Sequence, residues 1–170
     1  TAKPAYLLDR TALTLDRDQA SVTVGLDDGT EVVAKALIIT AGIGKFSPRP
    51  LPAADGWTGR GVEFFVPSLD PYVGRDVVIV GGGDSAFDWA LHLEPVATSV
   101  TLVHRRDAFR AHQRTVEAVR ESSVQIVTKA QVTRILGDDH PTGVELTVDG
   151  EEPRVIRAQA IVAALGFVAD

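Results

Sequence analysis

The stretch Val77-Val-Ile-Val-Gly-Gly-Gly-Asp-Ser-Ala86 predicts a buried parallel strand that turns directly into a helix. Residues 77–80 are all β-branched, which is typical of a strand covered on both faces of a sheet. Gly81, Gly83 and Ala86 then follow the spacing G-x-G-x-x-A. In that pattern the first glycine permits a tight turn, the second lets the backbone approach a pyrophosphate, and the small third residue lets the helix pack on the strand. The helix that follows would direct its first N–H groups at the phosphates.

The residues after the next predicted strand, 99–103, indicate which dinucleotide would bind. A carboxylate about twenty residues beyond the glycines holds the ribose of NAD, but this chain has His104-Arg105-Arg106 there, with Arg110 one turn later. Guanidinium groups bind a 2′-phosphate through charge-assisted hydrogen bonds, whereas a carboxylate would repel it. We therefore predict NADP(H) as the ligand. Two plainer interpretations stay open: a glycine turn that binds nothing, and a solvated basic start of the next helix.

Composition and charge exclude several classes of function. The 170 residues are 45% hydrophobic, which suits a globular domain or a domain and a half. No apolar run reaches about 18 residues and no signal-peptide pattern opens the chain, so we expect neither a membrane span nor a leader. The absence of cysteine excludes disulfides and thiolate metal sites and favours a cytoplasmic protein. The four histidines lack metal-ligand spacing, so no metal site is expected.

The net charge of −6 argues against nucleic-acid binding. Residues 104–120 nevertheless carry five arginines against only Asp107 and Glu117. A local basic cluster in an acidic protein suits a small anion better than a long polyanion. Arg114 and Arg120 fit the ordinary charged face of a helix.

The predicted elements fall into two parts that meet near residue 48. Extended pieces are expected over 5–16 and a hairpin around Asp28-Gly29, followed by a buried strand at 36–40. Prolines and glycines punctuate 43–60, which we interpret as a linker or crossing segment. Further strands are predicted at 61–66, 76–80, 99–103, 124–128, 131–136, 143–148, 153–157 and 160–163, and helices at 84–94 and about 107–121, the second broken near its start.

Two parts of the chain share one pattern. A hairpin turn, a short polar link and an apolar strand stopped by glycine occur at 28–42 and again at 149–166. Chance similarity of two β-meanders is one explanation. The other is a duplicated dinucleotide-binding domain, with the first copy's own glycine-rich turn upstream of Thr1. The second explanation predicts that this chain is a portion of a longer protein.

Three stretches resemble the thioredoxin-reductase-like ferredoxin–NADP reductases of bacteria. They are Val78-Ile-Val-Gly-Gly-Gly-Asp-Ser-Ala-Phe-Asp-Trp-Ala90, Val100-Thr-Leu-Val-His-Arg-Arg-Asp-Ala-Phe-Arg-Ala-His112 and Leu37-Ile-Ile-Thr-Ala-Gly-Ile-Gly-Lys-Phe-Ser-Pro-Arg49. That family consists of flavoproteins with two dinucleotide-binding domains, which pass electrons between NADPH and ferredoxin or flavodoxin. The resemblance implies an α/β fold in which 1–47 is the β-meander and strand of a partial FAD domain. Residues 48–170 would be the NADPH-binding domain, with a Rossmann-like parallel sheet, a βαβ core and a three-stranded meander.

The resemblance also implies a set of cofactor-binding residues, carried over position by position. They are Gly81, Gly82, Gly83, Asp84, Ser85 and Ala86 for the pyrophosphate, Arg105, Arg106 and Arg110 for the 2′-phosphate, His104 beside the adenosine, Thr40, Ala41 and Gly42 beside FAD, and Gly166 at the matching strand end of the NADPH domain.

One departure separates this chain from thioredoxin reductases, which carry a Cys-x-x-Cys shortly before the glycine-rich turn. Here that region reads Phe64-Phe-Val-Pro67, which excludes dithiol exchange. Hydride transfer between nicotinamide and flavin needs no side-chain nucleophile, so no catalytic residue is predicted.

The resemblance implies a ferredoxin–NADP reductase in the full-length protein, often a homodimer in this family, whereas the present chain alone is expected to lack activity. Two alternatives stay open. One is another flavoprotein with a similar NADPH module, a disulfide reductase or a monooxygenase. The other is a non-catalytic dinucleotide-binding module.

Overall fold

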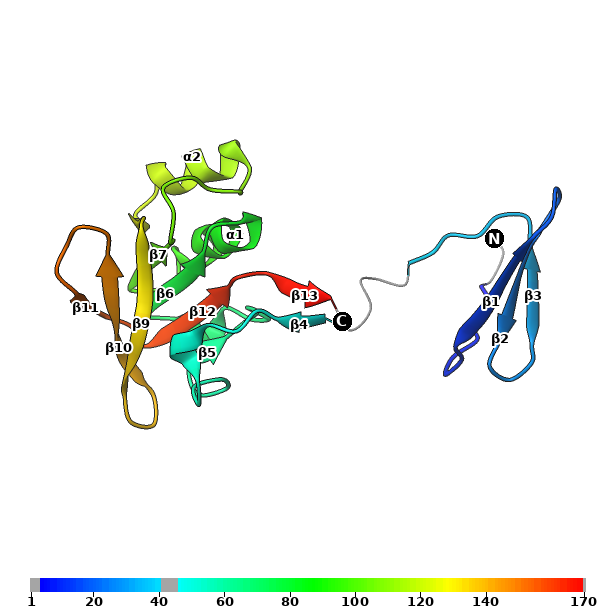
Figure 1. The fold of residues 1–170 in the computed structure, drawn as a ribbon, viewed down its shortest axis with the longest axis horizontal. Helices are drawn as coiled ribbons and strands as arrows, with labels where there is room; N and C mark the ends of the chain where they lie inside the picture. The colour runs from blue at the N-terminus through cyan, green and yellow to red at the C-terminus, as the bar shows by residue number, and fades with distance from the viewer. Residues whose placement is uncertain (1–3, 41–45, 170) are drawn as a thin grey trace. The chain divides into compact units, whose positions relative to one another are not determined.

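The computed structural model describes residues 4–40 and 46–169, and the chain divides into two compact units, 1–44 and 45–170. Figure 1 labels most of the helices and strands of both units. No helix within the described ranges is long and apolar enough to cross a membrane.

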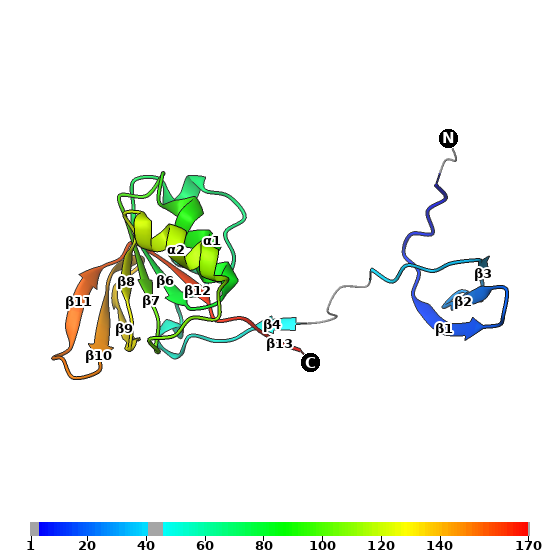
Figure 2. The same cartoon turned by 90° about the horizontal axis from the view of Figure 1, so that it is seen from above.

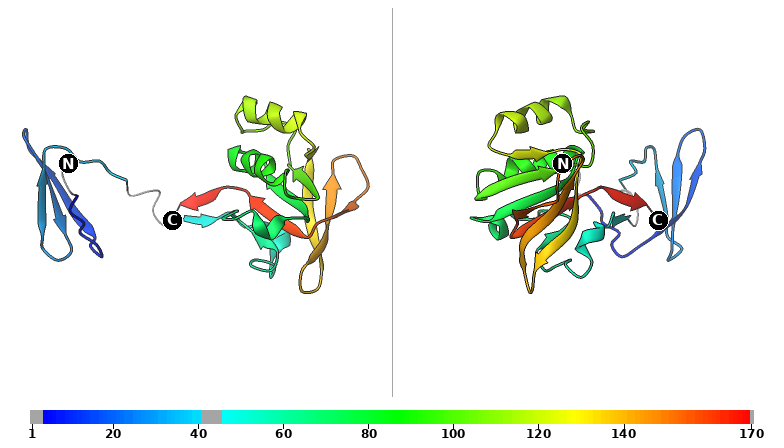
Figure 3. Two further views of the ribbon diagram at one scale, coloured as in Figure 1. Left: turned by 180° about the vertical axis from the view of Figure 1, so that it is seen from behind. Right: turned by 60° about the vertical axis from the view of Figure 1, so that its left-hand side comes forward.

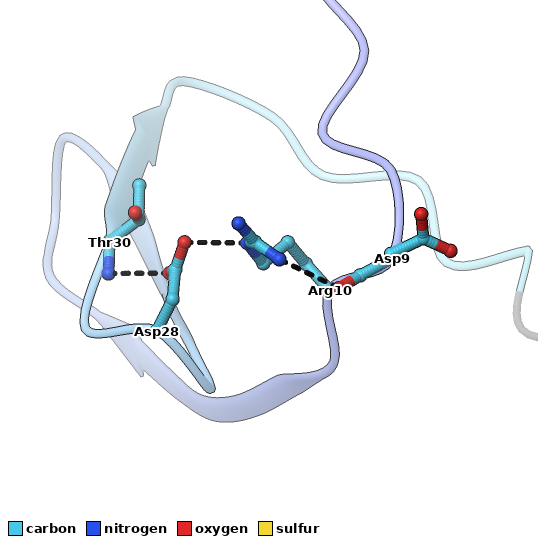
Figure 4. A network of polar contacts seen from close by, with 4 residues as sticks. All are labelled: Asp9, Arg10, Asp28 and Thr30. Atoms are coloured by element: carbon cyan, nitrogen blue, oxygen red, sulfur yellow. Dashed lines mark hydrogen bonds and ion pairs between the residues drawn. The ribbon is translucent and has the colours of Figure 1, made fainter.

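The first unit is a three-stranded antiparallel sheet. Its strands are β1 (Ala12–Arg17), β2 (Val22–Leu26) and β3 (Glu31–Ala34), in the order β1-β2-β3. The predicted turn joins β2 to β3, and Gly29 adopts a φ of 83°, which favours glycine. The carboxylate of Asp28 accepts hydrogen bonds from the Thr30 N–H (2.9 Å) and the Arg10 Nε (2.6 Å), as Figure 4 shows. The turn is thereby tied to the segment that precedes β1.

The prediction of a buried strand at 36–40 is wrong. These residues are irregular, and the side chains of Ile38 and Ile39 are 86% and 72% exposed. A strand requires a neighbour for its backbone N–H and C=O groups, and none of the strands in the described ranges pairs with this segment. The segment that matches it in the sequence repeat, 160–164, becomes a strand because it lies between two partners.

The second unit is built on a five-stranded parallel sheet in the order β5-β12-β6-β7-β8. The predicted βαβ core is confirmed: β6 (Asp76–Gly81) leads into α1 (Asp84–Leu93), which returns to β7 (Ser99–Val103). Because the strands are parallel, their carboxyl ends share one edge of the sheet (Figure 2). The other elements of the sheet and its second helix are β5 (Val62–Glu63), α2 (Gln113–Glu121), β8 (Gln125–Val127) and β12 (Ala160–Ala164).

The β-branched run of β6 is buried on both faces, as predicted. Val77 and Ile79 pack in a cluster with α1 and α2, whereas Val78 and Val80 pack in a second cluster with the antiparallel meander. This alternation is the period-2 geometry of a strand. Figure 3 shows helices and meander as separate layers about the sheet. The meander consists of β9 (Ala130–Gly137), β10 (Pro141–Val148) and β11 (Arg154–Arg157), in the order β11-β10-β9.

Residues 46–60 form a crossing segment that belongs to the second unit. The strand β4 (Phe46–Pro48) pairs with β13 (Phe167–Ala169), and the 3-10 helix η1 (Pro52–Ala54) packs against the meander. Leu51 is only 6% exposed there. The strand predicted at 61–66 shortens to β5, and a second 3-10 turn, η2 (Asp70–Tyr72), interrupts the loop before β6.

We expect Leu51→Ala to destabilise the second unit by about 2–5 kcal/mol, because it removes a buried side chain and leaves a cavity. Both tryptophans, Trp57 and Trp89, lie in this unit, so tryptophan fluorescence during urea unfolding isolates its transition. Val155→Ala, at a position 58% exposed, is the control and should cost less than about 0.5 kcal/mol. Equal, small effects of both variants would show that the crossing segment is not part of the core.

Candidate dinucleotide-binding site

The glycine turn, residues 81–83, lies at the carboxyl edge of the parallel sheet, between β6 and α1. Ligands of open α/β sheets bind at this edge, where the chain leaves for neighbouring strands on either side. Here β12 and β7 flank β6. At each of the three positions of the turn, a different structural reason favours glycine.

Gly81 is dictated by packing within the protein. A Cβ at this position would collide with the carbonyl oxygen of Ala164 and lie 2.9 Å from the Cβ of Ala86. The end of β12 and the start of α1 therefore approach the turn closely only because residues 81 and 86 are both small. The sequence motif predicts helix–strand packing for Ala86, whereas for Gly81 it predicts a tight turn and not this approach of β12.

Gly82 is dictated by an interaction that the sequence did not reveal. A Cβ at Gly82 would collide with the imidazole ring of His104, which packs directly over the turn. The motif leaves the middle position free, so no local signal in the sequence identifies this requirement.

Gly83 faces open space. Apart from Gly83 itself and its two chain neighbours, no atom of the residues that the structure describes lies within 4 Å of where its Cβ would be, and its φ of −102° is accessible to any residue. Gly83 is the N-cap of α1 and has no side chain with which to cap it. The first N–H groups of a helix have no partner within it, and residues 84 and 85 are exposed. The turn thus offers an anion both space and hydrogen-bond donors.

The arginine loop, residues 104–112, connects β7 to α2 and folds back over the glycine turn. Its backbone N–H groups donate to three separate elements: His104 to the Val127 carbonyl oxygen (2.8 Å), Arg110 to the Gly82 carbonyl oxygen (2.8 Å), and His112 to the Asp84 Oδ1 (2.7 Å). These bonds replace helical ones. The prediction of a helix from about 107 is therefore wrong, and α2 begins at Gln113.

Aromatic rings anchor the middle of the arginine loop. The Phe109 ring meets Phe87 of α1 edge-to-face, with 4.8 Å between centroids, and lies 5.5 Å from the His104 ring. Arg120 of α2 places its guanidinium 6.0 Å from the same ring. Sequence reasoning overlooked Phe109, although an aromatic residue within a basic, polar stretch was a signal of burial.

The arginine loop concentrates positive charge beside the glycine turn. Arg105, Arg106 and Arg110 are exposed, and none forms an ion pair with any residue that the structure describes. The one acidic residue of the loop, Asp107, faces Lys129, with 3.5 Å between Oδ2 and Nζ. The three guanidinium groups therefore remain available to an anion.

Burial lowers the pKa of His104, and the charges of Arg105, Arg106 and Arg110 lower it further. The carbonyl oxygen of Ala108, 3.2 Å from Nε2, opposes part of this shift. The imidazole over Gly82 is consequently neutral near pH 7.

The structure describes two of the four remaining predicted site residues. Thr40 is exposed in the irregular segment of the first unit, whereas Ala41 and Gly42 lie outside the described residues. Gly166 follows β12 with a φ of 84°, and its carbonyl oxygen accepts the Arg49 N–H at 2.9 Å. In the described ranges no three His, Asp or Glu side chains gather as a metal site would require.

The lowered pKa of His104 predicts that the stability of the second unit falls as the pH falls. The unfolded chain takes up the proton near pH 6.5, whereas the folded chain does so only at lower pH, so unfolding becomes easier below about 6.5. We expect urea titrations between about pH 7.5 and pH 5 to show a smaller loss for His104→Gln than for the wild type. Parallel pH profiles, or an NMR titration of His104 at or above its ordinary pKa, would contradict this expectation.

The chain is similar to proteins of a known family. The family model described as pyridine nucleotide-disulphide oxidoreductase matches residues 1–170. The ferredoxin–NADP reductases of Nocardioides sp. and Saccharopolyspora erythraea are 74% and 55% identical to the chain, covering 100% and 98% of it but 52% and 51% of their own lengths. The chain therefore spans about half the length of these curated relatives.

A solved structure shares the fold. Thioredoxin reductase from Giardia duodenalis is 28% identical and superimposes with a TM-score of 0.70, covering 94% of this chain and 53% of its own. The parallel sheet, the meanders and their order thus match the fold of flavoproteins with two dinucleotide-binding domains. With the family model matching from end to end, this chain belongs to the pyridine nucleotide-disulphide oxidoreductase family.

Proposed function

We propose that residues 45–170 bind NADPH, as the pyridine-nucleotide domain of a ferredoxin–NADP reductase. The observation that carries this proposal is the hydrogen bond from Arg110 N–H to the Gly82 carbonyl oxygen. It joins the arginine loop to the glycine turn, so that groups suited to a 2′-phosphate lie beside a turn suited to a pyrophosphate. The names of the relatives at 74% and 55% identity agree with this assignment.

Each part of the site has a proposed contact with the nucleotide. The pyrophosphate would lie against Gly83 and the first N–H groups of α1, contributed by Asp84 and Ser85. The 2′-phosphate would lie among the three guanidinium groups of the arginine loop, with the neutral His104 beside the adenosine. Bound NADPH supplies a hydride, and the residues of this unit bind and orient the nucleotide without acid–base chemistry of their own.

The first unit is proposed to be part of an FAD-binding domain. Its meander has the same consecutive strand order as the meander β9–β11 of the second unit, which supports the duplication inferred from the sequence. Residues 40–42 would then lie near the flavin. The complete activity, electron exchange between NADPH and ferredoxin or flavodoxin through FAD, is proposed for the longer protein. Because this chain contains no cysteine, its own residues cannot supply the dithiol that disulfide reduction uses.

The test is a calorimetric titration of the 170-residue chain with NADPH, NADH and 2′,5′-ADP. Arg105→Ala or Arg106→Ala should weaken NADPH and 2′,5′-ADP by about 1.5–3 kcal/mol, the scale of a hydrogen bond to a charged group, and change NADH far less. Arg154→Ala, an exposed arginine of β11, is the matched control and should leave all three affinities unchanged. Equal weakening of NADPH and NADH would remove the 2′-phosphate assignment.

Alanine substitutions at two neighbouring glycines should have different effects, one on nucleotide affinity and the other on the stability of the unit. Gly83→Ala should leave the urea transition unchanged, because its Cβ enters open space, yet weaken NADPH and NADH alike by tenfold or more, about 1.4 kcal/mol. Gly82→Ala should instead destabilise the unit by about 1–3 kcal/mol, because its Cβ displaces His104. Unchanged nucleotide binding by a folded Gly83→Ala protein would disprove the pyrophosphate assignment.

A further inference from the structure

The arginine loop is held at both of its ends. At its start, the His104 N–H donates to the last residue of β8 and its C=O accepts from the first residue of β9, and the Lys129 N–H donates to the Arg106 carbonyl oxygen at 3.4 Å. Lys129 adopts a φ of 51° at that point, and its ammonium faces Asp107. The backbone at the start of the loop is therefore fixed by β8, β9 and the two residues that connect them.

The end of the loop is fixed by two hydrogen bonds, one to the glycine turn and one to the first residue of α1. One joins backbone to backbone, from Arg110 to Gly82. The other runs from the His112 N–H to the carboxylate of Asp84, at 2.7 Å. Asp84 is thus the only side chain that ties the end of the loop to the turn through a hydrogen bond within the described residues.

Asp84 lies where two helices begin. It is the first residue of α1, and its acceptor atom meets the N-cap residue of α2, so the carboxylate lies at the N-terminal ends of two helices. Both helix dipoles stabilise a negative charge there. A carboxylate beside a pyrophosphate site would otherwise be unfavourable, since like charges repel. An anchoring role accounts for an acid at this place, whereas direct contact between its carboxylate and the phosphates does not.

We propose that Asp84 is a positioning residue, which sets the arginine loop against the glycine turn through the His112 N–H. It acts on the nucleotide through the loop, because its carboxylate determines where Arg110 and the preceding arginines stand relative to the turn. This inference rests on the proposed binding of NADPH. It adds that the preference for a 2′-phosphate depends on an acidic side chain that does not touch that phosphate.

The experiment compares Asp84→Ala, which removes the acceptor, with Asp84→Asn, which keeps an oxygen in place but removes the charge. Asp88→Ala, an exposed acid on the same helix, is the matched control. Each 170-residue chain is titrated with NADPH, NADH and 2′,5′-ADP. We expect Asp84→Ala to weaken NADPH and 2′,5′-ADP about fivefold to tenfold, less than the direct loss of a hydrogen bond to a charged group, because Asp84 acts on the nucleotide only through the loop. NADH should change less than about twofold, and Asp84→Asn should recover most of the loss.

Amide hydrogen exchange supplies a readout that does not depend on any ligand. In Asp84→Ala the His112 amide should exchange faster than in the wild type, and Asp84→Asn should restore its protection. The proposal is overturned if the His112 amide is unaffected, or if Ala and Asn variants change all three affinities alike, since Asp84 would then act only through its charge. It is also overturned if Asp84→Ala weakens NADPH and NADH equally.

Failure of the proposed function has a different signature. It appears in the wild-type chain, as equal affinity for NADPH and NADH and no binding of 2′,5′-ADP. Such a result would overturn the proposed function and, with it, the inferred effect of Asp84 on the preference for a 2′-phosphate. The exchange rate of the His112 amide would still decide whether Asp84 anchors the loop.

Discussion

The turn at residues 81–83 has no room for side chains at two of its three positions, and the rest of the second unit is arranged around that restriction. The end of β12 closes on Gly81 and the imidazole of His104 closes on Gly82. Only Gly83 opens outward. β6 is buried on both faces, and α1 begins so close to its end that a Cβ at Gly81 would lie 2.9 Å from the Ala86 Cβ. The same close packing that completes the core leaves one open position, with helix N–H groups beside it.

The sequence predicted what depends on local pattern. The β-branched run, the glycine spacing and the helix after it all appear where expected, since neighbouring residues determine them. The segments 36–40 and 160–164 show the limit, because both are apolar and end near a glycine, yet only the second has strands on either side. Likewise α2 starts late because Gly82 and Asp84, distant in the sequence, take the N–H groups of Arg110 and His112. A pattern of neighbouring residues in the sequence does not reveal such distant hydrogen-bond partners.

Of the candidate site, the arginines and glycines could be identified from the sequence, but their supports could not. His104 was expected beside a ligand, and in the structure its ring covers Gly82. Phe109 and Asp84 hold the loop through contacts with Phe87 and His112. The chain has a net charge of −6, but the acidic residues near the arginine loop have other partners: Asp107 faces Lys129, and Asp84 accepts the His112 N–H. The three guanidinium groups therefore face solvent without a neutralising carboxylate among the described residues. At physiological salt the field of such a cluster extends only about 8 Å, so it acts on a ligand already at the turn.

The contacts that hold the arginine loop have one more consequence, which concerns how coenzyme preference could change over time. The loop is secured by backbone amides at 104, 110 and 112 and by the rings of His104 and Phe109. The side chains of Arg105 and Arg106 take no part in these contacts in the described residues. Under the proposed function, recognition of the nucleotide and the architecture of the loop are therefore carried by different atoms of one short segment. Those two positions can accept other side chains at little cost to folding, which would make the proposed site evolvable toward a different nucleotide while its scaffold persists.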